Sequence, residues 1–277
     1  MNRRLPLAIA LAVVTSSGLA AAQAATPAES DAPRQPPYRG TIFIAPDIYL
    51  DSDPSTFESL ADAGTGTREM FDRRVNGMVT VEATLFNASF ADGLTLEVRV
   101  NPEFPHDHAE ELARHYMQAF GQLPTELRRG MENFNIHDGN EPFGGGGRSV
   151  LVHTGMGERY LEDGILAETL FHETVHATID DDLHDDPEWR AAQRADPTSI
   201  STYAEEHPDR EDLAETLLMT IAVDQRPERL PEGMADLLHA DIPHRLAFFR
   251  DRLAWNVDPT ATPSTPSASV DRDVTTP

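Results

Sequence analysis

Two histidines with three residues between them stand in the middle of the chain, and a glutamate follows the first directly. His172, Glu173 and His176 form the pattern H-E-x-x-H. Because positions i and i+4 of an α-helix share one face, the two imidazoles would converge on one point, where their neutral nitrogens can bind Zn²⁺. Glu173 would stand beside that point as a general base. The spacing therefore predicts a hydrolytic zinc site carried by a helix.

The residues around this motif predict a mostly buried helix. Asp163-Gly164 is a plausible helix start, and apolar side chains follow at helical spacing over residues 165–179. A buried polar group without a partner costs free energy, and a metal ion would give the two imidazoles and the carboxylate a common partner. An accidental spacing on an exposed helix is the alternative interpretation.

Zinc needs a third protein ligand, and the sequence offers two carboxylates. Asp182 could reach the metal only if the chain reversed at Ile179, a β-branched residue that resists the positive φ of such a turn. Glu211 opens a second predicted helix, which Asp209 could cap, and Glu215 one turn later could accept the outer N–H of a ligating histidine. We expect Glu211 to be the third ligand, against the alternative that these acids form a solvated helix face. The apolar stripe of this second helix comprises Leu213, Leu217, Leu218 and Ile221.

The motifs belong to a longer pattern along the chain. H-E-x-x-H at residues 172–176 is followed by S-T-Y-A at 201–204 and by E-D-L-A-E at 211–215. This combination resembles the anthrax-lethal-factor-like group of zinc metallopeptidases, also called gluzincin-type, which pair H-E-x-x-H with a Tyr-Ala and a downstream E-[DF]-[FL]-A-E helix. The resemblance extends through residues 143–147 and 186–189 and covers the chain from Tyr38 to about Trp255.

Carried over by position, the resemblance implies the roles of the site residues. His172, His176 and Glu211 would bind one zinc ion per chain, Glu173 would be the base, and Tyr203 would donate a hydrogen bond to the oxyanion. Tyr203 precedes Glu211 by eight residues, about one more than we expect for the family, and the loop between them can absorb an insertion.

These residues suit the hydrolysis of a peptide bond. Zinc lowers the pKa of a bound water towards roughly 7, and Glu173 can take the proton of that water and deliver it to the departing amine. The phenol of Tyr203 would stabilise the oxyanion; the alternative is a partly buried tyrosine with its hydroxyl at the surface.

We therefore expect a zinc endopeptidase, and two alternatives stay open: a zinc amidase acting on cell-wall peptides, and a non-catalytic binding module. The module is disfavoured because structural zinc sites are closed by four protein ligands and have no use for Glu173.

A short strand is predicted before the motif, at residues 148–153, after the glycine run 144–147. An extended peptide could pair with a free backbone edge of this strand, which would align a scissile bond without strong side-chain selection. The glycine run lacks the Lys-Ser/Thr of a phosphate-binding loop, so we interpret it as a flexible hairpin or the rim of a cleft.

The first residues predict export. Arg3 and Arg4 form a positive n-region, residues 5–14 an apolar h-region, and an A-x-A cleavage site ends at Ala24. Residues 1–24 are therefore predicted to be a cleavable signal peptide of a periplasmic or secreted protein, with an uncleaved anchor as the alternative. The chain has no Cys, so it forms no disulfides, and its fold must depend on its core and metal.

The chain is strongly acidic. Its net charge is −25, and removal of the signal with its two arginines takes the charge to −27. Nucleic acids and anionic membranes need basic patches, so we expect a polypeptide substrate, no nucleic acid and no stable membrane association. The acidic stretch 180–186 could attract Ca²⁺, but it lacks the spaced ligands and the glycine of an EF-hand loop, and we interpret it as solvated.

The remaining histidines lack ligand spacing, and we interpret them as surface or satisfied core residues. His153 would end the predicted cleft strand, which makes it the next oxyanion donor to consider after Tyr203.

Composition divides the chain into four parts. Residues 25–37 are rich in Pro and Ala, and residues 257–277 in Thr, Pro and Ser, so both segments are expected to be disordered. Between them, residues 38–256 are long enough for one catalytic domain. We expect an α+β fold, with a mixed β-sheet N-terminal lobe over the zinc helix and a mostly helical C-terminal lobe. Strands are predicted at 41–44, 78–86 and 94–100, and helices at 108–120, from Thr125, and from Gly164 onward to 243–255.

Overall fold

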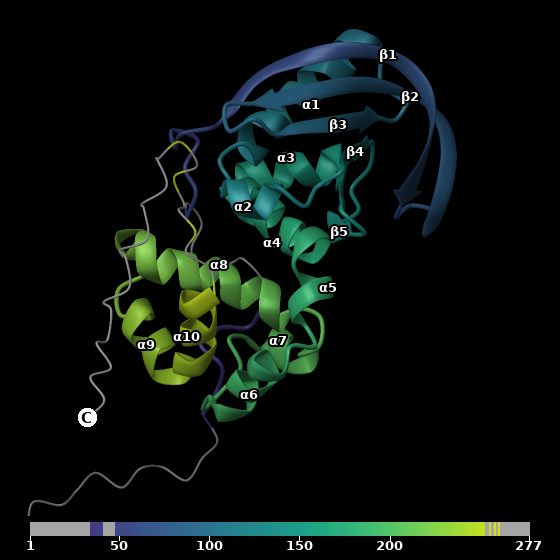
Figure 1. Cartoon of the computed structure of the whole chain (residues 1–277). Helices are drawn as coiled ribbons and strands as arrows, with labels where there is room; N and C mark the ends of the chain where they lie inside the picture. Colours follow the sequence, from purple (N-terminus) through teal and green to yellow (C-terminus); the bar gives the residue numbers. More distant parts are fainter. Residues whose placement is uncertain (1–33, 41–47, 253–254, 256–257, 259, 261–277) are drawn as a thin grey trace, which may run out of the picture. The chain divides into compact units, whose positions relative to one another are not determined.

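The computed structural model describes residues 34–40, 48–252, 255, 258 and 260 (Figure 1). The predicted signal peptide 1–24, the predicted strand 41–44, most of the linker 25–37 and nearly all of the tail 257–277 lie outside these residues. At the end of the predicted linker, Arg34 forms an ion pair with Asp241 at 3.0 Å. None of the described helices is both long enough and apolar enough to cross a membrane.

Six strands form one mixed sheet in the order β1-β2-β3-β4-β6-β5. The outer pairs β1–β2, β2–β3 and β5–β6 are antiparallel, whereas β3, β4 and β6 are parallel. The short β5 therefore forms one edge of the sheet, and β1 forms the other. The bounds are Phe57–Asp72 for β1, Gly77–Phe90 for β2, Thr95–Val100 for β3, Asn133–His137 for β4, Gly144–Gly146 for β5 and Ser149–His153 for β6.

β1 and β2 form a long, curved hairpin (Figure 1). They pair as far as Asp72 and Gly77 at the turn, while β3 pairs with β2 only from Thr84 to Ser89. The outer part of the hairpin thus projects beyond the third strand. It is stabilised by a small apolar cluster of its own, formed by Met70, Ala83 and Leu85 with Val79 and Val81 packed against it.

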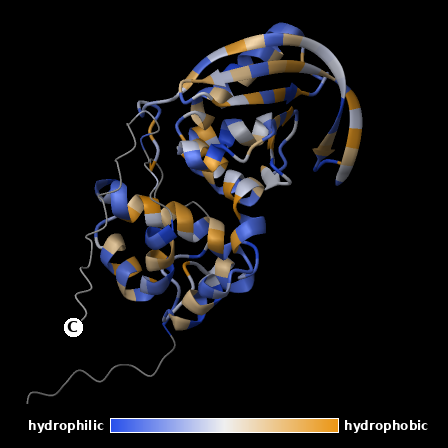
Figure 2. Cartoon of the chain, in the orientation of Figure 1, coloured by the Kyte–Doolittle hydropathy of each residue, from blue (hydrophilic) through white to orange (hydrophobic). Residues whose placement is uncertain are grey.

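Two helices cover one face of the sheet. α1 (His106–Phe120) packs on β1, β2 and β3, and α4 (Leu166–Thr178) packs on β5, β6 and α1. α1 is amphipathic: Ala109, Ala113 and Tyr116 recur at helical spacing and are buried. Figure 2 shows hydrophobic residues along β2, β3 and α8, as expected for elements that contribute to the main core.

The chain after α4 is almost entirely helical. α8 is buried along nearly its whole length, and the predicted apolar stripe at Leu213, Leu217, Leu218 and Ile221 lies in the core. The other described helices are α2 (Thr125–Arg128), α3 (Thr154–Glu162), α5 (Asp180–Leu183), α6 (Pro187–Ala195), α7 (Thr202–Glu206), α8 (Asp212–Gln225), the 3₁₀ turn η1 (Pro227–Arg229), α9 (Met234–Asp241) and α10 (Pro243–Arg252). The predicted α+β class, with a mixed N-terminal sheet and a mostly helical C-terminal part, is confirmed.

Two local predictions are wrong. The strand predicted at 148–153 has no free edge, because β6 lies between β4 and β5; the free edge belongs to the glycine strand β5. Asp209 does not cap α8: Glu211 is the N-cap residue, and the carboxylate of Asp209 binds Arg190 instead. The predicted start of α4 is nearly right, since Gly164 has a φ of +70° and the helix begins at Leu166.

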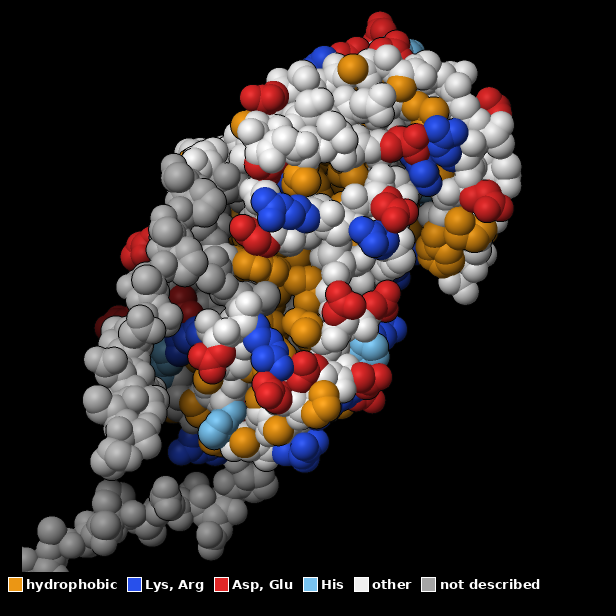
Figure 3. Space-filling view, in the orientation of Figure 1, with side chains coloured by type: hydrophobic (Ala, Val, Ile, Leu, Met, Phe, Trp, Pro, Cys, Tyr) orange, Lys and Arg blue, Asp and Glu red, His pale blue; other side chains and the backbone are white. Residues whose placement is uncertain are grey.

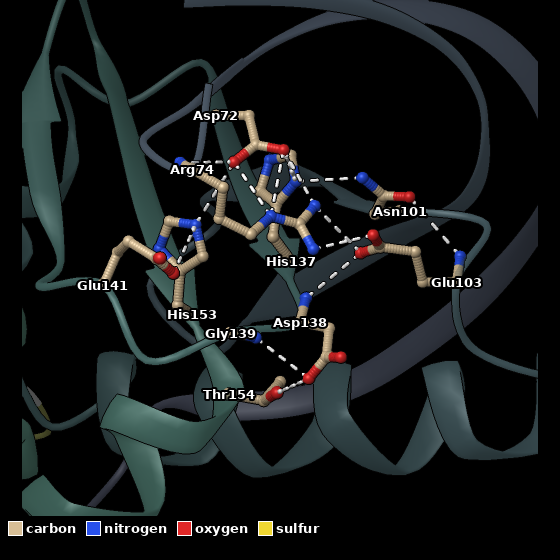
Figure 4. Close-up of polar contacts among 10 residues, drawn as sticks. All are labelled: Asp72, Arg74, Asn101, Glu103, His137, Asp138, Gly139, Glu141, His153 and Thr154. Carbon is tan, nitrogen blue, oxygen red and sulfur yellow. Dashed lines mark hydrogen bonds and ion pairs between the residues drawn. The ribbon is translucent and has the colours of Figure 1, made fainter. Parts of the chain in front are cut away.

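A buried polar cluster ties the hairpin turn to the ends of the parallel strands (Figure 4). Asp72, the last residue of β1, accepts hydrogen bonds from Arg74, which also pairs with Glu103. His137 and His153 end β4 and β6, are fully buried, and stack with their ring centroids 5.6 Å apart. Both rings face Asp72, at 3.8 Å from His137 Nδ1 and 3.6 Å from His153 Nε2. The cluster therefore fixes the position of the hairpin turn.

Acid should weaken this cluster and lower the stability of the fold. Burial lowers the pKa of His137 from 6.5 to about 4, and burial also lowers the pKa of His153. The unfolded chain therefore takes up these protons at a higher pH than the folded chain. The free energy of unfolding should be highest above about pH 6.5 and should decrease as the pH drops towards about 4. His137 alone should account for a decrease of up to about 3 kcal/mol.

Urea unfolding at about pH 7 and about pH 5 measures this loss. In His137→Asn the loss between the two pH values should be smaller than in the wild type, by about 2 kcal/mol. His244→Asn, an exposed histidine, is the matched control. The same pH dependence in His137→Asn and in the wild type would contradict the role of burial.

Candidate metal centre

α4 and the start of α8 bring three metal-binding side chains together. His172 and His176 lie one turn apart on α4, and Glu211 is the N-cap residue of α8. The Nε2 atoms of the histidines are 3.0 Å apart, and Glu211 Oε2 is 3.2 Å from His172 and 3.4 Å from His176. His172 and Glu211 are buried and His176 is partly exposed; their ligand atoms all lie within 4.8 Å of one another, so the group could hold a metal ion.

The donor types and the charges of this group both fit a metal cation. Imidazole and carboxylate are the ligands that zinc takes when it does not bind thiolates. Burial raises the pKa of Glu211, but the hydrogen bonds and charges of the two histidines hold it well below its usual range. Burial lowers the pKa of His176, but Asp180 and Glu211 raise it to about 10. The two carboxylates thus favour a positive charge at this point, which a metal ion can supply.

The outer nitrogens of the two histidines differ in their surroundings. His176 Nδ1 is hydrogen-bonded to the carboxylate of Asp180, whereas His172 Nδ1 is buried and has no hydrogen-bond partner among the described residues. Asp180 thus occupies the place predicted for Glu215, as the carboxylate that contacts the outer nitrogen of a histidine. The structure places Glu215 against Ser201, whose hydroxyl donates to it. The sequence did not predict Asp180 as the partner of His176, because Asp180 lies in the acidic stretch 180–186. Its position one turn after His176 is the signal that could have identified it.

Glu173 lines a cleft of about 670 Å³ that also contains the His-His-Glu group. Its side chain is half-buried, and none of the described residues forms a hydrogen bond or ion pair with its carboxylate. Tyr160, Phe143 and Arg73 line other parts of the same cleft. A carboxylate without a partner, beside a group of metal-binding side chains, is free to exchange protons with a bound molecule.

Tyr203 contacts the Glu211 oxygen that does not face the histidines. Its hydroxyl donates to Glu211 Oε1 at 3.3 Å, and Arg210 donates to the same oxygen at 2.9 Å. The backbone of residues 38–40 positions Tyr203, because its N–H donates to the carbonyl of Arg39, and a Cβ on Gly40 would lie 2.9 Å from the Cβ of Tyr203. The spacing of eight residues therefore lets the phenol reach Glu211.

The glycine strand β5 forms the wall beside Glu173. A Cβ on Gly145 would lie 1.7 Å from the carbonyl oxygen of Glu173, so only glycine allows the strand to approach the helix this closely. The same strand is the free edge of the sheet. A free edge thus lies on the strand next to the predicted one, and it contacts α4.

Replacement of Gly145 by alanine should destabilise the fold, since the added Cβ meets backbone atoms that cannot move without shifting α4. We expect a loss of about 1 to 3 kcal/mol, which urea unfolding measures. Gly77→Ala is the matched control, because the nearest atom to a Cβ there is 3.8 Å away. If the two variants are equally stable, β5 does not pack on Glu173 as described.

The alternative residues do not join the group. Asp182 is exposed; Ile179 has a φ of −119°, so the chain continues into α5 and does not reverse. Asp186 caps α6, and among the described residues the His-His-Glu group is the one cluster with metal-binding spacing.

His153 is buried against Asp72 and does not line the cleft, which removes it as the next oxyanion donor. Its two ring nitrogens have no hydrogen-bond partner among the described residues, so it is not a satisfied core histidine.

Comparisons with family models, with curated proteins and with solved structures find no match for this chain. Its function has to be argued from the chemistry of the site.

Proposed function

We propose that this chain is an exported, zinc-dependent endopeptidase that cleaves polypeptides in the cleft beside α4. The observation that carries the proposal is that Glu173 lines the same cleft as the donors of His172, His176 and Glu211. A structural zinc site would be closed by a fourth protein ligand and would gain nothing from a carboxylate without a partner. The resemblance of the sequence motifs to the anthrax-lethal-factor-like metallopeptidases supports the same assignment.

The residues would divide the reaction between them. A zinc ion held by His172, His176 and Glu211 would supply Lewis acidity to the cleft. Glu173 would accept a proton from the attacking water and pass it to the departing amine, and Tyr203 would donate to the oxygen on which negative charge develops. The free edge of β5 would align the peptide backbone beside Glu173. We propose Glu211 over Asp182 as ligand, and a cleavable signal at residues 1–24 as the route of export.

Tyr203→Phe should lower kcat by roughly 10²- to 10³-fold, because the variant lacks the donor to the oxyanion. Zinc content and KM should stay nearly unchanged, since the contact is made in the transition state and not in the ground state. Steady-state kinetics and metal analysis of the same preparation measure both. A loss of less than about threefold would show that Tyr203 only supports Glu211, with which it shares a hydrogen bond.

Hydrolysis assays on two substrates test the proposed function. The zinc-loaded protein should release peptides from casein, a chelator should stop the release, and added zinc should restore it. Metal analysis should find about one zinc per chain, because the three ligands converge on one site. Cleavage of peptidoglycan without cleavage of casein would favour the cell-wall amidase. Zinc binding without hydrolysis of either would overturn the proposal in favour of a binding module.

A further inference from the structure

A second pocket adjoins the metal cleft. It has a volume of about 390 Å³ and lies between the hairpin turn and the sheet face that α1 and α4 leave uncovered. Phe71, Arg73 and Gly145 line both the pocket and the metal cleft, so the two are neighbouring parts of one surface. A ligand that occupies the cleft beside Glu173 can therefore extend into this pocket.

The floor of the pocket is polar. Asn135 donates to Asn133 at 2.9 Å and to Ser149 at 2.6 Å, and the hydroxyl of Ser149 donates to Asn133 at 2.7 Å. Asn135 is buried, and its Oδ1 has no hydrogen-bond partner among the described residues. A sheet face that only packed against its own chain would be expected to carry apolar side chains here. The floor is therefore suited to a polar ligand.

Arg73 stands where the pocket meets the cleft. A Cβ on Gly144 would lie 2.8 Å from a terminal nitrogen of Arg73, so the absence of a side chain there makes room for the guanidinium. No described residue forms a hydrogen bond or ion pair with this guanidinium. A second arginine, Arg99, lies in the floor, where it binds Glu97. In a chain of net charge −25, a cation without a partner at a pocket mouth is suited to an anionic group.

Exposed apolar side chains flank this arginine along the hairpin. Phe71, Val75 and Met78 are 40%, 64% and 60% exposed, and they belong to the small set of large apolar side chains that the described surface exposes. Figure 3 shows the apolar patch at the free end of the hairpin. Asp180 and Asp181, from α5, also line the metal cleft and give that part of its wall a negative charge. Arg210 also lines the cleft and Glu69 lines the second pocket, but Arg210 binds Glu211 and Arg99 binds Glu97. Of the arginines that line these two pockets, Arg73 is therefore the one without a described partner, and an anionic ligand would lie at the hairpin side.

We propose that this pocket binds the carboxylate-bearing part of a peptide substrate, with Arg73 as the residue that receives the carboxylate. The guanidinium can bind both oxygens of the group at once, and Phe71 and Met78 can pack against the adjoining aliphatic carbons. The inference rests on the proposed function for the class of ligand, a peptide. An acidic side chain and a free C-terminus carry the same group, and the test separates them.

Binding is measured on the full chain carrying Glu173→Gln and loaded with zinc, so that no probe is consumed. The probes are four fluorescein-labelled peptides of one sequence: acidic side chains with a free C-terminus, the same peptide with Asn and Gln in place of the acids, the same peptide with an amidated C-terminus, and the peptide with both changes. Fluorescence anisotropy gives each Kd in the parent, in Arg73→Gln and in Arg194→Gln. Arg194 is an exposed arginine outside both pockets and serves as the control.

The parent should bind the carboxylate-bearing peptides more tightly than the doubly neutral one, by roughly tenfold to a hundredfold. Arg73→Gln should lose this preference and Arg194→Gln should keep it. Loss of the preference with the Asn/Gln peptide identifies an acidic side chain as the source, and loss with the amidated peptide identifies the C-terminus. An unchanged preference in Arg73→Gln, or no measurable binding of any peptide, overturns the inference. The casein assay is independent of these titrations, so failure of the proposed function is seen separately.

Discussion

Glu173→Gln should retain its zinc and lose about 10²- to 10⁴-fold in kcat. The substitution keeps the size of the side chain and leaves His172, His176 and Glu211 in place, but an amide cannot accept a proton from water. None of the described residues binds the Glu173 carboxylate, so its replacement should not disturb the fold. Metal analysis and casein hydrolysis on one preparation measure the two properties.

The control for this variant is Asp181→Asn, which removes a negative charge from the same cleft at an exposed position. It should retain both zinc and most of the activity, since Asp181 does not belong to the group of His172, His176 and Glu211. Hydrolysis by Glu173→Gln at the wild-type rate would disprove the assigned base, whatever the metal content.

Glu211→Ala should abolish zinc binding, whereas Asp182→Ala should leave it unchanged. Glu211 Oε2 faces both histidines within 3.4 Å, while Asp182 is exposed and outside the group. Without Glu211, only two protein donors remain at the centre, and structural or catalytic zinc sites have at least three. Zinc content after dialysis, and the rise of Tm on adding zinc, report the loss.

These two substitutions serve as matched controls for each other, because both remove one carboxylate from an acidic chain. Equal zinc content in Glu211→Ala and the wild type would reject Glu211 as a ligand. A loss of zinc in Asp182→Ala would show that α5 rearranges when the metal binds, contrary to the helical conformation of Ile179.

Helical spacing explains why the centre of the site could be predicted from the sequence. His172 and His176 lie on one face because four residues make about one turn, and the apolar stripe that begins at Leu213 marks α8 as a buried helix. Glu211 could be placed because it stands where that stripe begins. The short-range rules of a helix were sufficient for these residues, and for the α+β class as a whole.

The residues that surround the centre depend on contacts that are distant in the sequence. β1 is mostly exposed and carries Gly, Thr and Asp, so it shows no apolar alternation and was not predicted. β5 consists of glycines, which show no alternation of apolar and polar side chains, so the sequence did not predict it as a strand. Its partner β6 was therefore predicted to have a free edge. The approach of Gly145 to Glu173 and the position of Arg73 at the mouth of the second pocket follow from this pairing and from the hairpin, and no local pattern contains them.

The cleft is built from two kinds of wall, and they differ in how freely they can change over evolution. Beside Glu173 the wall is the backbone of β5, and at Gly145 no side chain can replace the glycine. Next to the glycine strand stands the turn 73–76, in which Arg74 binds Asp72 and Glu103 while Arg73, Val75 and Asn76 are exposed. Under the proposed function, mutations at those exposed positions would alter which peptides bind without changing the proposed catalytic residues. Relatives of this chain could thus differ in the peptides that they would bind while keeping the same proposed metal ligands and base.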